Sequence, residues 1–147
     1  MKKGRILRLA AVLACAAAIG VLPAGARQDT KETASPTIQP VSWDGWLAAK
    51  AKAEENDAAG NLVAALQYYL EYARQAEGLN NPARVAWGKN NAAYMIIKMH
   101  RLDPTVDLAP AEKLLGEGMA VTGASEDCRK VMAMNLEHVR TCLRAPR

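Results

Sequence analysis

The stretch "PARVAWGKNNAAYMIIKMHR", from Pro82 to Arg101, is the most informative part of the sequence for the fold. It follows Asn81, so that an asparagine caps the predicted helix and a proline takes its first position. At 100° per residue its apolar side chains form two faces. One face carries Ala83, Ala86, Trp87, Ala93, Tyr94 and Ile97, and the other carries Val85, Ala92, Met95, Ile96 and Met99. Such a helix is sandwiched between neighbours or lines a groove, so we predict that it forms the middle of a stack.

Two adjacent asparagines, Asn90 and Asn91, interrupt this apolar pattern. Asn90 lies near the centre of the first apolar face, and Asn91 lies at its margin. Because the backbone of a helix is already hydrogen-bonded, a buried amide needs a partner on another helix or a loop, or it costs about 1–3 kcal/mol. Asn135 has a similar position in the last predicted helix. We interpret Asn90 and Asn135 as structural amides that fix the register of neighbouring helices; a catalytic or ligand-binding role is the alternative.

Four further helices are predicted around this one from capping residues and helix breakers. They run from Ser42 to about Asp57, from Asn61 to about Glu77, from Asp107 to before Gly123, and from Ser125 to about Leu143. Gly60, Gly78 and Gly123 are the expected helix stops. No segment shows the alternation that is typical of a strand. The predicted fold class is therefore all-α: a stack of antiparallel α-hairpins, with about two helix pairs and a C-terminal capping helix.

The N-terminal segment has the three-part layout of a secretory signal peptide. A basic start is followed by an apolar run, Leu9 to Leu22, and by the small residues Ala24-Gly25-Ala26. We predict a signal peptide over residues 1–26 and export to the periplasm or the extracellular space, without stable membrane insertion after cleavage. A lipoprotein signal at Cys15 is the alternative. The polar residues 27–42 contain two prolines and predict a flexible linker, and residues 43–144 form the helical domain.

The signal peptide also explains the charge of the chain. Of the 19 Lys and Arg residues, four lie in this segment, whereas all 15 Asp and Glu residues lie after it. The chain after the predicted cleavage point therefore has no net charge, although the whole sequence is basic. This balance gives no support for binding to nucleic acid or to an acidic membrane surface.

The segment Trp87-x2-Asn90-Asn91-x2-Tyr94 resembles the first-helix pattern of the tetratricopeptide repeat, W-x2-L-G-x2-Y. Gly60-Asn61-Leu62, followed by Ala65 and Tyr69, is similar to the turn and second helix of that repeat. The resemblance extends roughly from Ser42 to Leu143. The sequence departs from the pattern in four places. The two asparagines replace a leucine and a glycine, Ala49 stands where a tryptophan is expected, "RLDPTVD" lengthens the spacing, and Pro82 comes later than the terminal proline of the repeat. The resemblance implies a stack of helical hairpins with a concave surface that binds proteins or peptides.

By this resemblance, a candidate partner-binding groove lies on the first, third and fifth helices. Methionines and a glycine would make it apolar and adaptable, which suits an irregular hydrophobic partner. The predicted groove residues are Lys50, Val85, Gly88, Lys89, Ala92, Met95, Met99, Met132 and Leu136. The competing interpretation is that the same residues form the core of a small domain. The groove predicts exposed apolar surface along Val85, Ala92, Met95 and Met99.

The remaining reactive residues give no catalytic pattern. Cys128 and Cys142 lie on one predicted helix, about 21 Å apart, which is too far for a disulfide within the chain. We interpret them as buried free thiols; the alternative is an antiparallel dimer that pairs Cys128 with Cys142 of a second copy. His100 and His138 have no metal-ligand spacing, and no catalytic or phosphate-binding motif is present. We therefore predict a non-catalytic binding scaffold without metal or cofactor. A self-associating structural module of the cell envelope is the alternative, and an enzyme of unknown class a distant third.

Overall fold

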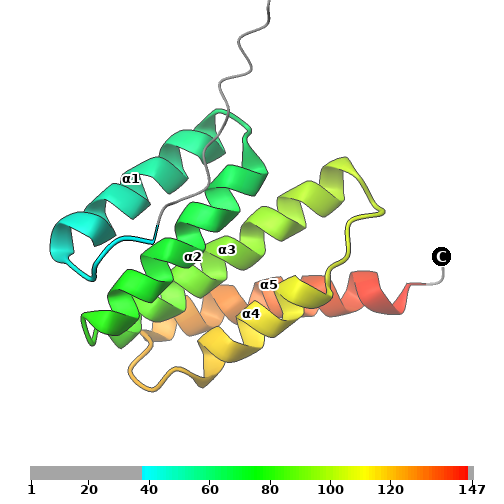
Figure 1. Cartoon of the computed structure of the whole chain (residues 1–147). Helices are drawn as coiled ribbons and strands as arrows, with labels where there is room; N and C mark the ends of the chain where they lie inside the picture. Colours follow the sequence, from blue (N-terminus) through cyan, green and yellow to red (C-terminus); the bar gives the residue numbers. More distant parts are fainter. Residues whose placement is uncertain (1–37, 146–147) are drawn as a thin grey trace, which may run out of the picture. The chain divides into compact units, whose positions relative to one another are not determined.

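The computed structural model describes residues 38–145, and these form five α-helices and no strand (Figure 1). The helices are α1 (Trp43–Ala58), α2 (Leu62–Gly78), α3 (Pro82–Leu102), α4 (Ala109–Ala120) and α5 (Glu126–Arg144). Their ends agree with the predicted ends to within two residues, and the predicted all-α stack is confirmed. The predicted signal peptide and the linker as far as residue 37 lie outside the described residues.

Side-chain caps determine where three of the helices begin. The Ser42 hydroxyl accepts a hydrogen bond from the Gly45 amide at 2.9 Å, and the Asn81 side chain accepts one from the Arg84 amide at 3.2 Å. The Ser125 hydroxyl accepts from the Cys128 amide at 3.3 Å. Each cap satisfies a backbone donor that the helix leaves free, which is why capping residues predicted these boundaries well.

The turn after α2 differs from its prediction. Gly60 and Gly123 have positive φ values of 77° and 91°, as expected at their turns, but the residue with positive φ after α2 is Asn80, at 53°. Gly78 is instead the last residue of α2. A Cβ at Gly78 would lie 2.6 Å from Val41 Cγ2, so this glycine is required by the close approach of the chain entering α1.

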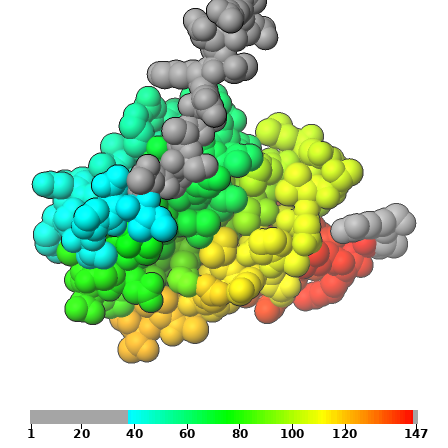
Figure 2. All heavy atoms as spheres, in the orientation of Figure 1, coloured from blue at the N-terminus to red at the C-terminus, as the bar shows by residue number. Residues whose placement is uncertain are grey.

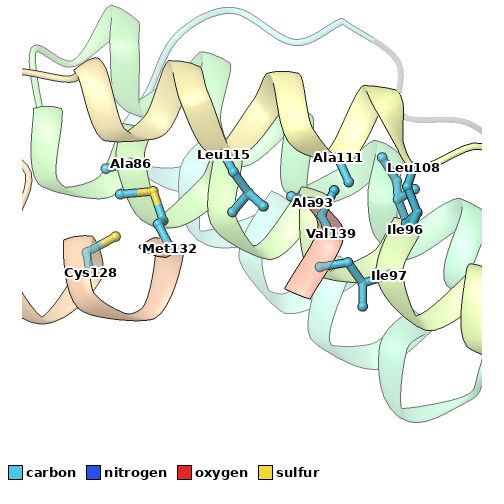
Figure 3. Close-up of a cluster of buried hydrophobic side chains, with 10 residues drawn as sticks. All are labelled: Ala86, Ala93, Ile96, Ile97, Leu108, Ala111, Leu115, Cys128, Met132 and Val139. Carbon is cyan, nitrogen blue, oxygen red and sulfur yellow. The ribbon is translucent and has the colours of Figure 1, made fainter. Parts of the chain in front are cut away.

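Helix α3 lies in the interior of the stack. One core cluster joins one face of α3 to α4 and α5 (Figure 3), and contains Ala86, Ala93, Ile96, Ile97, Leu108, Ala111, Leu115, Cys128, Met132 and Val139. On its other face, Val85, Ala92 and Met95 belong to clusters shared with α1 and α2. The prediction that this helix has two apolar faces because it lies between neighbours is confirmed.

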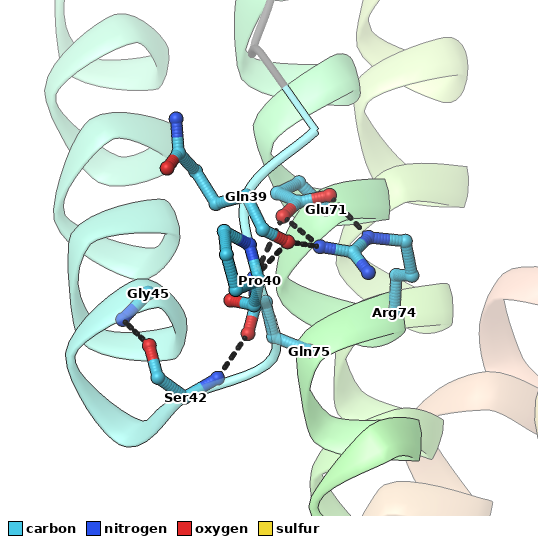
Figure 4. Close-up of polar contacts among 7 residues, drawn as sticks. All are labelled: Gln39, Pro40, Ser42, Gly45, Glu71, Arg74 and Gln75. Atoms are coloured by element: carbon cyan, nitrogen blue, oxygen red, sulfur yellow. Dashed lines mark hydrogen bonds and ion pairs between the residues drawn. The ribbon is translucent and has the colours of Figure 1, made fainter.

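Residues 39–42, which the sequence assigns to the linker, are held against α2 (Figure 4). The buried Gln75 donates from Nε2 to the Pro40 carbonyl at 3.1 Å and accepts the Ser42 amide at Oε1, at 2.9 Å. Arg74 donates to the Gln39 carbonyl at 2.5 Å and also contacts Glu71. Because a buried amide and a guanidinium of α2 bind the backbone of residues 39–42, these residues are part of the helical domain.

This polar cluster should make stability depend on pH. The hydrogen bond from Arg74, with a further one from Gln75, lowers the pKa of Glu71. A carboxylate with a lowered pKa in the folded state contributes stability above its unfolded pKa of about 4.3, and loses it as the pH falls through the folded pKa. We expect Glu71→Gln to reduce stability near pH 7 and to flatten its decline below about pH 4.3. Urea midpoints measured between pH 7 and pH 3 would check this.

The exposed pair of Lys50 and Glu54, separated by 2.6 Å, provides the control. Glu54→Gln is expected to follow the wild-type pH profile, because exposed helix pairs contribute little. A Glu71→Gln profile parallel to that of the wild type would contradict the role assigned to Glu71.

Candidate functional site

Most of the predicted groove residues are buried in the core, and the prediction of an exposed methionine-lined groove is wrong. Val85 is 7% exposed, Ala92 0%, Met95 1% and Met132 0%. Gly88 is also buried, because α2 passes directly over it: a Cβ there would lie 2.7 Å from Tyr72 Cδ1 and 3.0 Å from Ala73 Cα. The competing interpretation, burial in a small core, therefore applies to these five residues.

The other predicted groove residues are only partly accessible. Met99 and Leu136 pack as half-buried side chains against the cluster that α3 shares with α4 and α5. Lys50 pairs with Glu54 on its own helix. Lys89 crosses from α3 to α4 and pairs with Glu117. The residues of the predicted groove are thus distributed over separate environments and do not line one surface.

Asn90 and Asn135 each have a hydrogen-bond partner on another helix, as the sequence predicts. Asn90 is 4% exposed, and its Oδ1 accepts a hydrogen bond from Asn135 Nδ2 at 3.0 Å. Its own Nδ2 donates to Asn91 Oδ1 at 3.2 Å. The partner on an adjacent helix is therefore on α5, and the amide pair links α3 to α5 at one defined register.

A double-mutant cycle would measure this link. We expect Asn90→Ala and Asn135→Ala each to destabilise the fold, with a coupling free energy of about 1 kcal/mol between them. The Asn56–Asn135 cycle is the matched control, because the Asn56 amide binds the Lys52 carbonyl within α1 and shares no hydrogen-bond partner with Asn135 in the described residues, so this cycle should be close to additive. Chemical denaturation of the single and double variants gives the four free energies. Equal coupling in both cycles would contradict a specific Asn90–Asn135 contact.

The two cysteines of α5 have different environments. Cys128 is completely buried, and burial raises the pKa of its thiol. Cys142 is half-buried, with its sulfur 3.9 Å from His138 Nε2. Both thiols are free. The alternative in which Cys128 bonds to Cys142 of a second copy conflicts with the burial of Cys128, because α5 would have to leave the core. In the described part of the chain, no cluster of His, Cys, Asp and Glu could hold a metal.

A surface that was not predicted from the sequence lies between α2 and α4, next to Val85 and Lys89 of α3. Two adjoining cavities share Glu77 and Val85, and we call them together the α2–α4 hollow; Figure 2 shows this face. The first, of about 190 Å³, is lined by Leu70, Ala73, Arg74, Glu77, Val85, Lys89, Leu114 and Glu117. The second, of about 340 Å³, is lined by Glu77, Asn80, Asn81, Pro82, Val85 and Val121. Of the predicted groove residues, only Val85 and Lys89 are in it.

The α2–α4 hollow combines an apolar base with charged edges. Val85 and Ala73 are buried at its base, and Leu70 is 41% exposed. Lys89 Nζ binds the Glu117 carboxylate, and this hydrogen bond lowers the pKa of Glu117. Arg74 binds Glu71. Apolar side chains with a small number of oriented polar groups around them are typical of small binding sites. The hollow is therefore the candidate functional site.

Comparison with known proteins adds no family to this description. No protein-family model matches the chain, and no curated protein or solved structure is significantly similar to it. Among the described helices, none combines the length and the apolar character that crossing a membrane requires.

Proposed function

We propose that this chain is an exported, non-catalytic scaffold that binds a segment of a protein or peptide partner. The observation that carries the proposal is the α2–α4 hollow, with buried Val85 at its base and ion pairs at its edges. The resemblance of the Trp87–Tyr94 segment to the tetratricopeptide repeat supports the same class of function, because that family binds peptides and proteins. The proposed surface differs from the methionine-lined groove that this resemblance implies.

The dimensions of the hollow suit a short segment. Leu70 and Glu77 are seven residues apart on α2, which corresponds to about 10 Å along the helix. This length accommodates two turns of a helix or about three residues of an extended strand. The cavity of about 190 Å³ over Val85 is large enough for an aliphatic side chain. A partner would therefore insert one or two apolar side chains and leave its polar groups at the charged edges.

A capture experiment with two matched variants tests this function. Leu70→Glu places a charge in the hollow, whereas Leu102→Glu places the same charge at the end of α3, on a side chain that is 80% exposed. With the exported chain as bait in an envelope extract, we expect the wild type and Leu102→Glu to retain a partner that Leu70→Glu loses. Capture of the same partner by all three proteins would contradict binding in the hollow.

The export step makes its own prediction. If the proposed signal peptide is cleaved after Ala26, N-terminal sequencing of the exported protein should begin at Arg27. A protein that retains Met1 would contradict cleavage. A lipid-modified Cys15 at the N-terminus would favour the lipoprotein alternative, which ends in a membrane anchor.

The outer surface of α5 supports a second candidate function, self-association as a homodimer. Met134 is 73% exposed and Val131 is 36% exposed on this helix. Exposed apolar side chains at helical spacing can pair with a second copy. Sedimentation of the exported protein with and without reductant tests this candidate, and a monomer in both conditions would contradict it.

A further inference from the structure

We infer that the α2–α4 hollow selects a segment in which an aliphatic residue is next to a lysine or arginine. The aliphatic side chain would lie over Val85, and the neighbouring cation would pair with Glu77. This inference rests on the proposed function of the hollow as a binding site, and it adds the chemistry of the partner.

Glu77 is the one charged side chain of the lining that has no ion pair within residues 38–145. Lys89 is paired with Glu117, and Arg74 is paired with Glu71. Arg74 lies three residues before Glu77, at a spacing that permits a helix pair. Its guanidinium nevertheless points elsewhere, to Glu71 and to the Gln39 carbonyl. The basic groups of the hollow are therefore occupied, while one carboxylate remains open to a partner.

The position of Glu77 on its helix increases the local negative potential. It lies in the last turn of α2, which contains no basic residue. The negative end of the helix dipole lies at a C-terminus, where it disfavours a negative charge and favours a positive one. A neutral or basic residue at this position would stabilise α2 more than Glu77 does. A bound cation would gain from both the carboxylate and the helix end.

The two cavities place this charge beside the apolar base. Glu77 and Val85 line both of them. A side chain in the smaller cavity contacts Leu70, Val85 and Leu114, and the next residue of the same segment can reach Glu77. A segment with an acidic residue at that place would face the unpaired carboxylate, and like charges at close range disfavour binding.

Three capped peptides probe this selectivity. The first is acetyl-Ala-Leu-Arg-Ala-amide, and in the other two the Leu-Arg pair is replaced by Leu-Glu or by Ser-Arg. Each is titrated into the 15N-labelled exported chain, and amide shifts of Glu77 and Val85 are followed by NMR. We expect the Leu-Arg peptide to shift both amides and to bind about fivefold more tightly than the Leu-Glu peptide. The Ser-Arg peptide should bind more weakly, because it lacks the aliphatic side chain.

Two variants separate charge selectivity from binding itself. Glu77→Gln should keep the dispersed NMR spectrum of the folded protein and lose the preference for the Leu-Arg peptide over the Leu-Glu peptide. Glu137→Gln on α5 should retain that preference. Equal affinity of the wild type for the Leu-Arg and Leu-Glu peptides, with shifts at Val85, would overturn this inference and leave the binding function intact. If none of the peptides shifts Val85, the proposed function of the hollow fails as well.

Discussion

Replacing Met95 with aspartate is expected to remove most of the stability of the domain. Met95 is 1% exposed and packs with Ala53, Ala65, Tyr69 and Ala92 from α1, α2 and α3. The substitution deletes a buried apolar side chain and leaves a charge without a partner in the core. Together these effects cost on the order of 5 kcal/mol, and a domain of this size has about 5–15 kcal/mol to lose. Far-UV circular dichroism with thermal melting should show reduced helicity and no cooperative transition at high temperature.

Met134 provides the matched control for this substitution, because it is 73% exposed in the middle of α5. Met134→Asp introduces the same side chain into a helix without burying it. Its effect on the free energy of unfolding should be within about 0.5 kcal/mol. A Met95→Asp protein as stable as Met134→Asp would mean that α2 does not cover this face of α3.

Adding a single methyl group at Gly88 is expected to be the second most damaging change. The new Cβ would lie 2.7 Å from Tyr72 Cδ1, 2.8 Å from Ala73 Cβ and 3.0 Å from Ala73 Cα. Because a backbone atom is among these neighbours, the two helices must move apart. We expect Gly88→Ala to destabilise the domain by about 2 kcal/mol, and to lower its melting temperature by roughly 10 °C.

The same substitution at Gly116 should change stability in the opposite direction. Gly116 is in α4, and a Cβ there meets no atom within 4 Å. Gly116→Ala should therefore show only the intrinsic helix preference for alanine, a gain of about 1 kcal/mol. Calorimetry of the two variants beside the wild type makes the comparison. A stabilising Gly88→Ala would show that α2 and α3 are further apart than described.

Local chemistry explains why the helices could be predicted from the sequence. Ser42, Asn81 and Ser125 are residues whose side chains can accept the free amides of a helix start, and each does so. The two apolar faces of α3 follow from its spacing alone, so its interior position was also predictable. The turn at Asn80 was not, because Gly78 is required by a contact with Val41 that is distant in sequence.

The binding surface was harder to predict than the fold. Periodicity tells which residues share a helix face, but not which neighbouring helix covers that face. Val85 and Met95 lie on the same side of α3, yet Val85 borders the hollow while Met95 lies within the core. Leu70 was one signal available in the sequence, because it is a large apolar residue outside the apolar face of α2. That face consists of Leu62, Ala65, Leu66, Tyr69, Ala73 and Ala76. Glu77 gave another, as an acidic residue at the C-terminal end of a helix.

Methionine oxidation is the most direct test of the interior position of α3. If α3 is an interior helix, the methionines on this face lie in the core and do not line an exposed groove. Brief hydrogen peroxide treatment of the folded protein, followed by peptide mass spectrometry, reports which sulfur atoms the oxidant reaches. We expect rapid oxidation of Met134, which is 73% exposed, and oxidation at least about tenfold slower at Met95 and Met132, which are 1% and 0% exposed. Oxidation of Met95 as rapid as that of Met134 in the folded protein would contradict the interior position of α3.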